Sequence, residues 1–441
     1  MLGQDRVFDI LSKAIDCSDA DMTQATLTIG DSSLTRFASS IIHQNVSERN
    51  AGVAVKAVIG KQIGYATTNR LDDESIKTIA EKAVRFARLS QPNTDFVSLP
   101  SPKPIPSVDT YDECTAEYSP EDRAKDVAAM IAEAKKVGAS ASGTMANGYE
   151  ESGIMNSLGI KAYGKMSLAN LTTVMTTDGG NGYADQVSER IADLHPIDAA
   201  VEAATCSVRS KNPESIDPGE YDVILLPYAV SEFMEFMAWL GLGALSVQEG
   251  RSFMSGKFGE KIMGENISIW DDGLDPSGLP RAFDPEGVPK QRVDMIVNGV
   301  AKAVVYDSYT AYKEGKESTG HGTGGIGTYG PMPVNMFMKP GDSSVDEMIA
   351  STKKGILVTR FHYVNVIHPI LMLITGMTRD GTFLIEDGKI TKPLRNLRFT
   401  DGITDRLSNV ELISRETKRQ PIGVAPAIKA KGFHFTGATE F

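Results

Sequence analysis

Arginine, histidine and aspartate side chains stand inside otherwise apolar segments near residues 360 and 380. Residues 360–363 read Arg-Phe-His-Tyr, and residues 375–380 read Thr-Gly-Met-Thr-Arg-Asp. Charged groups in such segments cost desolvation free energy unless they pair or line a cavity, so they are better site candidates than surface charges. The candidate substrate-binding residues in these segments are Arg360, His362, Arg379 and Asp380. The last three of these are also the candidate catalytic residues.

A second charged segment, residues 249–253, reads Glu-Gly-Arg-Ser-Phe. We add Glu249 and Arg251 to the candidate substrate-binding residues. A structural alternative stays open for the whole set, because arginine and aspartate side chains at strand ends also form buried ion pairs. A histidine in such a strand can likewise be a hydrogen-bonded core residue.

Histidine and cysteine are too few and too widely spaced to predict a metal site. No two of the six histidines stand four residues apart, whereas a zinc-protease helix needs two imidazoles one turn apart. On one strand His362 and His368 would lie about 20 Å apart, too far to share an ion. Cys17, Cys114 and Cys206 form no C-x-x-C motif, which favours a reducing, cytoplasmic location. We expect neither a metal nor a cofactor in this chain.

Glycines cluster at residues 320–327 and include a G-x-G-x-x-G match at Gly322, Gly324 and Gly327. A dinucleotide site of this kind needs a helix N-terminus directly after the motif. Residues 328–333 read Thr-Tyr-Gly-Pro-Met-Pro and cannot begin a regular helix there. We interpret the cluster as a loop whose role the sequence leaves open.

The composition indicates a globular protein with a sizeable core. Of the 441 residues, 41% are hydrophobic and 23% are charged, and the net charge is −12. Such a surface repels phosphate backbones and anionic lipid headgroups, so neither nucleic acid nor a membrane is expected as a partner. The longest apolar stretch, residues 364–377, is interrupted by Asn365, His368 and Pro369 and is too short to span a bilayer.

Local signals place helices and strands along the first half. Residues 1–16 have the apolar spacing of a packed helix. Short strand-like runs follow at 25–29, 41–47, 52–59 and 62–67, and Gly60-Lys61 predicts a hairpin between the last two. Asp72 or Asp73 can cap a helix, and Ser119-Pro120 predicts the start of another that Gly138 ends. A further helix is expected around 196–210.

Residues 211–220 concentrate proline, glycine and polar residues, so we place the domain boundary there. Beyond it, 223–226 should be a buried strand and 230–240 an enclosed helix, since that segment is apolar nearly all round. Asn298-Gly299 and Asp387-Gly388 are typical of type I′ hairpin turns. The predicted fold class is α+β: an N-terminal α/β domain (1–215) with a mixed or antiparallel sheet, and a C-terminal β-rich domain (216–441) with few helices.

The chain as a whole resembles the TldD/PmbA family, which has been described as modulators of DNA gyrase and as peptide-processing metalloproteases. The pieces that carry the resemblance are Gly52-Val-Ala-Val, Gly64-Tyr-Ala-Thr-Thr-Asn69, Asn156-Ser-Leu-Gly159, Tyr221-Asp-Val-Ile-Leu-Leu-Pro227, Glu249-Gly-Arg-Ser-Phe253, Asp284-Pro-Glu-Gly-Val-Pro289, Asn298-Gly299 and Phe383-Leu-Ile-Glu-Asp-Gly-Lys-Ile390. The resemblance implies two domains of the kinds just described and a dimer that encloses a peptide-accessible cavity.

The family has a catalytic type, with an H-E-x-x-x-H helix and a later cysteine for zinc, and a PmbA/TldE type without them. Counted from Pro227, the two histidines and the glutamate would fall near Glu235, Phe236 and Leu240. Moreover, no histidine lies between 195 and 321, and no cysteine follows Cys206. The chain therefore resembles the PmbA/TldE branch.

Three functions remain open from the sequence. The first is a non-catalytic subunit that pairs with a zinc-bearing TldD-like paralogue to degrade or mature unfolded peptides. The second is a metal-independent hydrolase built on His362, Arg379 and Asp380. The third is a homodimeric peptide-binding module without chemistry. In the first case the zinc would belong to the partner subunit.

Overall fold

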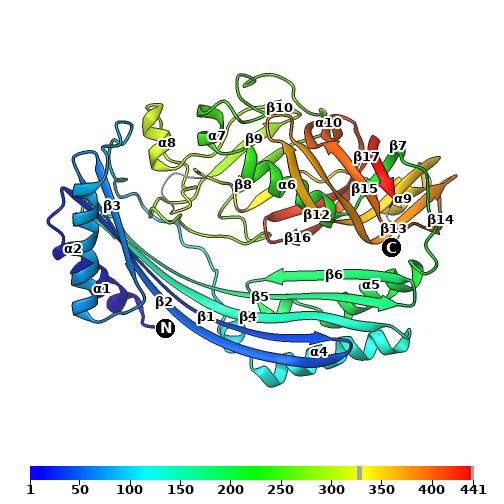
Figure 1. The fold of residues 1–441 in the computed structure, drawn as a ribbon, viewed down its shortest axis with the longest axis horizontal. Helices are drawn as coiled ribbons and strands as arrows, with labels where there is room; N and C mark the ends of the chain where they lie inside the picture. The colour runs from blue at the N-terminus through cyan, green and yellow to red at the C-terminus, as the bar shows by residue number, and fades with distance from the viewer. Residues whose placement is uncertain (325–329, 439–441) are drawn as a thin grey trace.

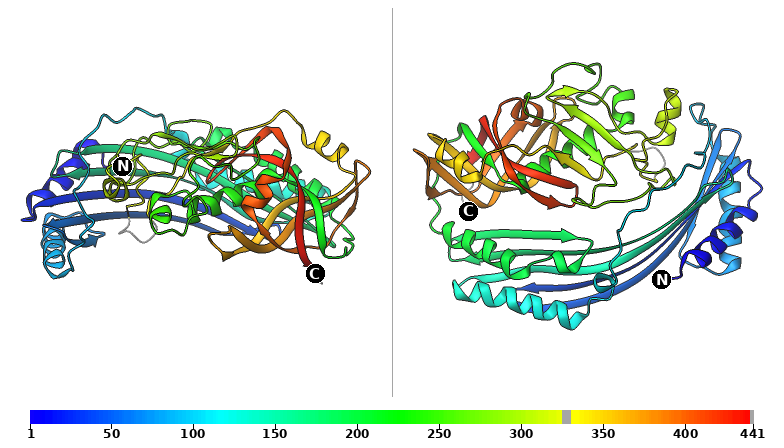
Figure 2. Two further views of the ribbon diagram at one scale, coloured as in Figure 1. Left: turned by 90° about the horizontal axis from the view of Figure 1, so that it is seen from above. Right: turned by 180° about the vertical axis from the view of Figure 1, so that it is seen from behind.

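The computed structural model describes residues 1–324 and 330–438 and confirms the predicted α+β class. The N-terminal half forms a long curved sheet with helices on its convex side, and the C-terminal half lies over the concave side (Figure 1). The view from behind in Figure 2 shows the same stacking, with the N-terminal helices on the side of the sheet away from the second half. The concave side of the sheet therefore faces protein.

The first sheet has six antiparallel strands in the order β3-β2-β1-β4-β5-β6. Its strands are β1 (Met22–Ala38), β2 (Ile41–Ile59), β3 (Gln62–Thr68), β4 (Ser140–Asn156), β5 (Lys161–Thr177) and β6 (Gly180–Ser188). The predicted runs 41–47 and 52–59 are not separate: they form the single strand β2. The polar residues between them continue the pairing with β1, where Asp31 stands opposite Arg49. The hairpin at Gly60-Lys61 is confirmed.

Four helices cover the convex face of this sheet: α1 (Gln4–Asp16), α2 (Asp73–Leu89), α4 (Pro120–Lys136) and α5 (Pro196–Arg209). The predicted caps are confirmed, because the Asp72 side chain accepts the Ser75 backbone N–H and the Ser119 side chain accepts that of Asp122. The short helices α3 (Glu113–Ala116) and η1 (Ile191–Asp193) lie in the connections. Alternation along β1 sends Leu27 to the helix side and leaves polar residues on the concave side.

The second sheet has eleven strands in the described part of the chain. They are β7 (Gly219–Leu225), β8 (Ile269–Asp272), β9 (Arg292–Val297), β10 (Val300–Ala301), β11 (Met336–Met338), β12 (Lys354–His368), β13 (Leu373–Glu386), β14 (Lys389–Pro393), β15 (Leu397–Gly402), β16 (Val410–Gln420) and β17 (Gly423–Ala438). Pairing of β17 with both β15 and β7 closes a ring through β12 and β13. Both Asn-Gly and Asp-Gly hairpin turns are confirmed.

Helices are sparse in this half, as predicted. The enclosed helix α6 (Pro227–Leu240) packs against β12 and β17, and Phe233 stacks on Phe361 with ring centroids 5.6 Å apart. The others are α7 (Ala244–Gln248), α8 (Ser308–Lys313), α9 (Val345–Ala350) and α10 (Ile403–Ser408). No described helix is both long and apolar enough to cross a bilayer.

Two predictions about loops have different outcomes. The glycine motif falls partly on residues 325–329, so Gly327 lies outside the described residues. No helix follows in 330–335, which agrees with the rejection of a dinucleotide site. The N-terminal helices end at Arg209 and the second sheet begins at Gly219. The division at 215/216 lies in this connection and stays a prediction.

Two glycines allow helices to approach the first sheet closely. A Cβ on Gly64 would lie 2.2 Å from the Ala83 carbonyl oxygen of α2, and one on Gly182 would lie 2.0 Å from the Ala203 carbonyl oxygen of α5. Neither backbone can yield without moving its helix. Any larger residue at these positions must push the helix off the sheet.

We expect Gly182→Ala to lower the free energy of unfolding by about 3 kcal/mol, because the added methyl group overpacks the contact with α5. Gly52→Ala on β2 is the matched control, since its Cβ meets no atom within 4 Å, and it should change stability by less than about 0.5 kcal/mol. Urea denaturation followed by circular dichroism measures both. Equal losses in the two variants would contradict the packing explanation.

Candidate functional site

A cavity of about 430 Å³ lies where the two halves meet, and we call it the interface cavity. Its walls come from β6 of the first half and from α6, β12 and the β16–β17 turn of the second. The lining residues are Tyr183, Asp185, Tyr228, Ser231, Glu232, Glu235, Arg360, Phe361, His362, Tyr363, Gln420, Pro421 and Ile422. Cavities of this size between parts of a chain are typical of small-ligand sites.

Helix α6 supplies two carboxylates to the cavity. Glu232 and Glu235 stand three residues apart, so they project from the same side of the helix. Burial raises the pKa of Glu232 to about 7, repulsion from Glu235 adds to this, and attraction to Arg360 opposes it. Glu232 can therefore hold or release a proton near neutral pH, as an acid or base in catalysis must.

Strand β12 supplies Arg360 and His362 from one face of the strand. The Arg360 Nε donates to Asp380 Oδ2 at 2.8 Å, and its guanidinium lies 4.2 Å from the centroid of the Tyr183 ring. Asp380 is buried, with only 2% of its side chain exposed. Arg360 is thus held by a carboxylate behind it and an aromatic ring in front.

The wall from β6 is built from hydrogen-bonded polar groups. The Tyr183 hydroxyl donates to Asp185 Oδ2 at 2.7 Å, and the Gln420 amide donates to Asp185 Oδ1 at 2.8 Å. The Tyr228 hydroxyl donates to Glu202 Oε1 at 2.9 Å. Burial and nearby carboxylates raise the pKa of both tyrosines, so they stay protonated and act as hydrogen-bond donors.

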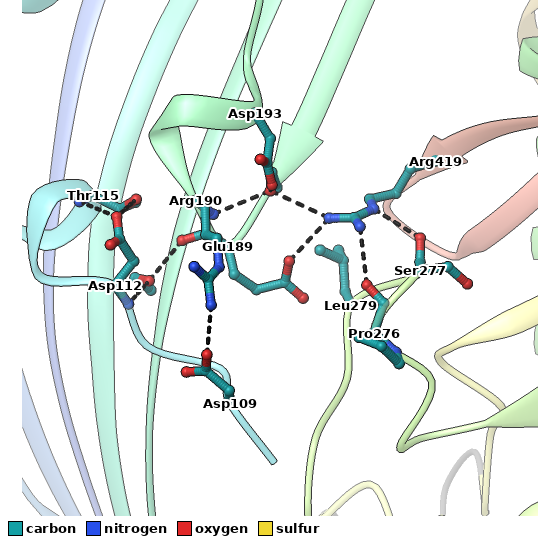
Figure 3. Close-up of polar contacts among 12 residues, drawn as sticks. Asp109, Asp112, Thr115, Glu189, Arg190, Asp193, Pro276, Ser277, Leu279 and Arg419 are labelled. Carbon is teal, nitrogen blue, oxygen red and sulfur yellow. Dashed lines mark hydrogen bonds and ion pairs between the residues drawn. The ribbon is translucent and has the colours of Figure 1, made fainter.

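An arginine beside the cavity joins the two halves directly. Arg419, at the end of β16, donates to the backbone oxygens of Pro276 and Ser277 at 3.0 and 2.8 Å. Its Nη1 donates to the Ser188 hydroxyl oxygen at 3.2 Å and to Glu189 Oε2 at 3.0 Å. Figure 3 shows the guanidinium between the Glu189 segment and the loop that carries Ser277. This contact fixes the end of β6 against the second half.

The structure brings together some of the predicted site residues and separates others. Arg360 and His362 line the interface cavity, and Asp380 lies directly behind Arg360. Arg379 does not line this cavity; its Nε is 3.9 Å from Asp380 Oδ1, and 43% of its side chain is exposed. Since Arg360 takes the carboxylate, Arg379 is left mainly in solvent.

Glu249 and Arg251 also stand apart from the interface cavity. They follow α7, and the Arg251 Nε donates to Glu249 Oε2 at 2.5 Å, with both side chains partly exposed. They form a local surface pair. The role of the predicted set in binding substrate stays a prediction.

His362 is closer to a site residue than to a core residue. Burial and the positive charges of Arg379 and Arg360 lower its pKa, so the imidazole is neutral at physiological pH. No hydrogen bond of its ring is found among the described residues, so the structure does not show the hydrogen-bonded core histidine that the sequence left open as an alternative. A neutral ring of this kind can accept a proton.

Sequence reasoning missed the residues of β6 and the acidic residues of α6. Tyr183 and Asp185 could not be found, because they reach the cavity only through the packing of one half on the other. Glu232 and Glu235 did carry a signal. Two carboxylates inside a helix that is apolar nearly all round must face either a cavity or a partner.

The residues of α6 do not fit a zinc ion. Helix α6 contains no histidine and no cysteine, the side chains that most often bind zinc in proteins. Within 1–324 and 330–438, no three histidine, cysteine, aspartate or glutamate side chains are grouped to hold a metal.

We expect Arg360→Met to lower the free energy of unfolding by about 3 kcal/mol, because it leaves the Asp380 carboxylate buried without its partner. Arg379→Met is the matched control and should cost less than about 1 kcal/mol, since Arg379 is half exposed. Chemical denaturation of both variants at neutral pH makes the comparison. A larger loss in the Arg379 variant would show that the two arginines have the opposite roles.

We expect Glu232→Gln to stabilise the protein only at higher pH. The native pKa lies near 7, above the ordinary value of 4.5, so the native state binds the proton more tightly and stability falls as pH rises through this window. The free energy of unfolding of the variant should exceed that of the parent by up to about 3 kcal/mol at pH 8, and the two should be equal near pH 4. Denaturation at both pH values tests this, and Glu81→Gln on exposed α2 should show no pH-dependent difference.

Two family models match the chain. The model described as the PmbA/TldA metallopeptidase C-terminal domain covers residues 218–437, and PmbA/TldA metallopeptidase domain 1 covers residues 27–87. The first match contains α6 and all the strands of the second half.

Curated relatives span nearly the same length. A metalloprotease of Methanocaldococcus jannaschii is 24% identical over 90% of this chain and 90% of its own. A metalloprotease TldD homolog of Haemophilus influenzae is 24% identical over 96% of this chain and 93% of its own length. A metalloprotease PmbA homolog of the same organism is 26% identical over 86% of this chain and 84% of its own length.

Solved structures share the fold. TldE from Thermococcus kodakarensis superposes with a TM-score of 0.89 at 21% identity, covering 98% of this chain and 100% of that one. A Thermotoga maritima protein described as a candidate modulator of DNA gyrase superposes with a TM-score of 0.86 at 22% identity. The superposition covers 98% of this chain and 99% of that one. Taken with the two matched domain models, these likenesses identify the chain as a member of the PmbA/TldD metallopeptidase family.

Proposed function

We propose that this chain is the non-catalytic, TldE/PmbA-like subunit of a cytoplasmic peptidase complex that degrades or matures unfolded peptides. The observation that carries the proposal is the set of residues that α6 presents beside the interface cavity. The helix lines the interface cavity but contains no histidine or cysteine, and by the ungapped count from Pro227 the two histidines and the glutamate of the family's catalytic type would fall near Glu235, Phe236 and Leu240. A zinc-bearing TldD-like paralogue would then supply the metal and the hydrolytic step.

The chemistry of the cavity supports a role in holding peptide. Hydrogen-bond acceptors for peptide N–H groups line it, namely the carboxylates Glu232 and Glu235 of α6, while Tyr228 and Gln420 are held in the wall by their own hydrogen bonds. An extended peptide has unpaired backbone groups that such residues can satisfy, whereas a folded substrate has already paired its own. Arg360 has its charge matched by Asp380, so it stiffens the wall rather than attracting anions.

A metal-independent hydrolase is the second candidate function, and one observation favours it. Glu232, with its pKa near 7, shares the cavity with the neutral ring of His362. A carboxyl group and an imidazole can divide the roles of acid and base at neutral pH. In this case the chain would hydrolyse peptide alone.

We expect the isolated chain to contain no stoichiometric zinc and to leave unfolded peptide intact, while its complex with a zinc-bearing family member from the same host hydrolyses it. Co-purification from that host, metal analysis and a peptidase assay with and without a chelator test this. Turnover by the pure chain that survives chelation would overturn the proposal in favour of the second candidate.

Two variants sharpen the experiment. In the complex, Glu235→Ala should weaken peptide hydrolysis mainly through a higher KM, because it removes an exposed hydrogen-bond acceptor from the cavity wall. In the pure chain, loss of any activity by Glu232→Gln would assign that activity to the interface cavity. A homodimer that binds peptide without cleaving it, even with the paralogue present, would identify a binding module and also contradict the proposal.

A further inference from the structure

The charged groups that line the interface cavity do not balance. Three carboxylates line it, those of Asp185, Glu232 and Glu235, whereas Arg360 brings one guanidinium group. The ring of His362 adds no charge, because its pKa is lowered and the imidazole is neutral at physiological pH. The lining of the cavity is therefore acidic.

The guanidinium group of Arg360 is already matched by an acid behind the lining. Asp380 accepts from the Arg360 Nε at 2.8 Å, and only 2% of the Asp380 side chain is exposed. Arg360 also attracts the Glu232 carboxylate, but burial and repulsion from Glu235 outweigh this attraction, since the pKa of Glu232 is raised. The negative charge of the lining is thus left largely uncompensated.

The three carboxylates differ in the contacts they already make. Asp185 accepts from the Tyr183 hydroxyl at 2.7 Å and from the Gln420 amide at 2.8 Å. Glu232 and Glu235 have no hydrogen bond or ion pair among the described residues. Glu232 is partly buried, and a carboxylate taken out of water without a partner costs free energy. These two carboxylates can therefore accept hydrogen bonds from a positively charged ligand.

An exposed aromatic ring lines the same cavity. Tyr363 of β12 is 78% exposed, and within the described part of the chain no lysine or arginine lies over its ring. The ring of Tyr183, in contrast, already has the Arg360 guanidinium 4.2 Å from its centroid. The faces of tyrosine rings attract ammonium and guanidinium groups. Tyr363 is thus the ring that a cation from outside can use.

The volume of the cavity favours an organic cation over a metal ion. About 430 Å³ equals about fourteen water molecules at ~30 Å³ each, far more than a single ion fills. The cavity has room for an amino-acid side chain together with neighbouring peptide groups. A metal ion would also need three grouped ligands, which the described residues do not provide.

We propose that the interface cavity binds a positively charged group of a peptide, with Glu232 and Glu235 as its acceptors and the Tyr363 ring as a further contact. Charge-assisted hydrogen bonds to two carboxylates select basic peptides over neutral ones. The inference deepens the proposed function and rests on it only in taking the ligand to be a peptide. The charged group is a basic side chain or a free N-terminus, and the two share the chemistry recognised here.

Calorimetry on the full chain with three amidated tripeptides tests the proposal. They are an N-acetylated peptide with lysine in the middle, the same peptide with norleucine in place of lysine, and the norleucine peptide with a free N-terminus. We expect at least one cationic peptide to bind about tenfold more tightly than the neutral peptide. Preference for the lysine peptide assigns the site to a side chain, and preference for the free amine assigns it to the N-terminus. Equal affinity for all three peptides, or no binding of any, would overturn the proposal.

Variants of α6 locate the site. Glu232→Gln and Glu235→Gln keep the size of the side chain but remove its charge, so each should weaken binding of the preferred cationic peptide about fivefold or more. Neither should change the affinity for the neutral peptide. Glu81→Gln on the exposed face of α2 is the matched control and should change neither affinity. A denaturation curve for each variant confirms that it is folded. A charge preference that survives both α6 substitutions would place the ligand elsewhere and contradict the proposal.

Failure of this inference can be told apart from failure of the proposed function. The chain is tested alone and no turnover is measured. Loss of the charge preference, with zinc-dependent hydrolysis by the complex intact, would overturn only the inference. A clear charge preference in a chain whose complex hydrolyses no peptide would overturn only the proposed function.

Discussion

The junction between the end of β6 and the end of β16 is the contact on which the rest of the arrangement depends. Arg419 spans three segments there, and its partner Glu189 has only 10% of its side chain exposed. The next residue, Gln420, holds Asp185 at 2.8 Å. Because a buried carboxylate without its partner would cost several kcal/mol, the two halves are fixed at this point rather than free to slide.

The position of this junction also determines where cavities can form. It brings β6 up to α6 and β12, so that the interface cavity takes its walls from both halves. Farther along the sheet, the side that faces the second half carries small or polar residues such as Thr26, Thr28 and Ser152. Such residues cannot form a dry, close-packed interface, so the halves meet through polar cavities instead of a continuous apolar core.

Features with local causes could be predicted from the sequence, and features with distant causes could not. The caps at Asp72 and Ser119 and the Asn298-Gly299 turn follow from neighbouring residues and are confirmed. The full length of β2 could not be predicted, because its polar middle is stabilised by pairing with β1 rather than by burial. Arg360 and Arg379 looked alike in sequence, but in the paired strands Arg360 donates to Asp380 at 2.8 Å, whereas Arg379 lies 3.9 Å from it and is more exposed.

Glu232 of α6 stands at a position where a carboxylate lowers stability. An apolar residue in place of Glu232 would avoid both the desolvation of its carboxylate and its repulsion by Glu235. Residues that lower stability in this way are typical of functional sites, where the cost is offset elsewhere in the fold. Here the Arg360 and Asp380 pair, the aromatic stack of Phe233 on Phe361 and the Arg419 junction hold the surrounding walls. A rigid wall around the poorly stabilised Glu232 carboxylate is consistent with the proposed role of this cavity in holding peptide.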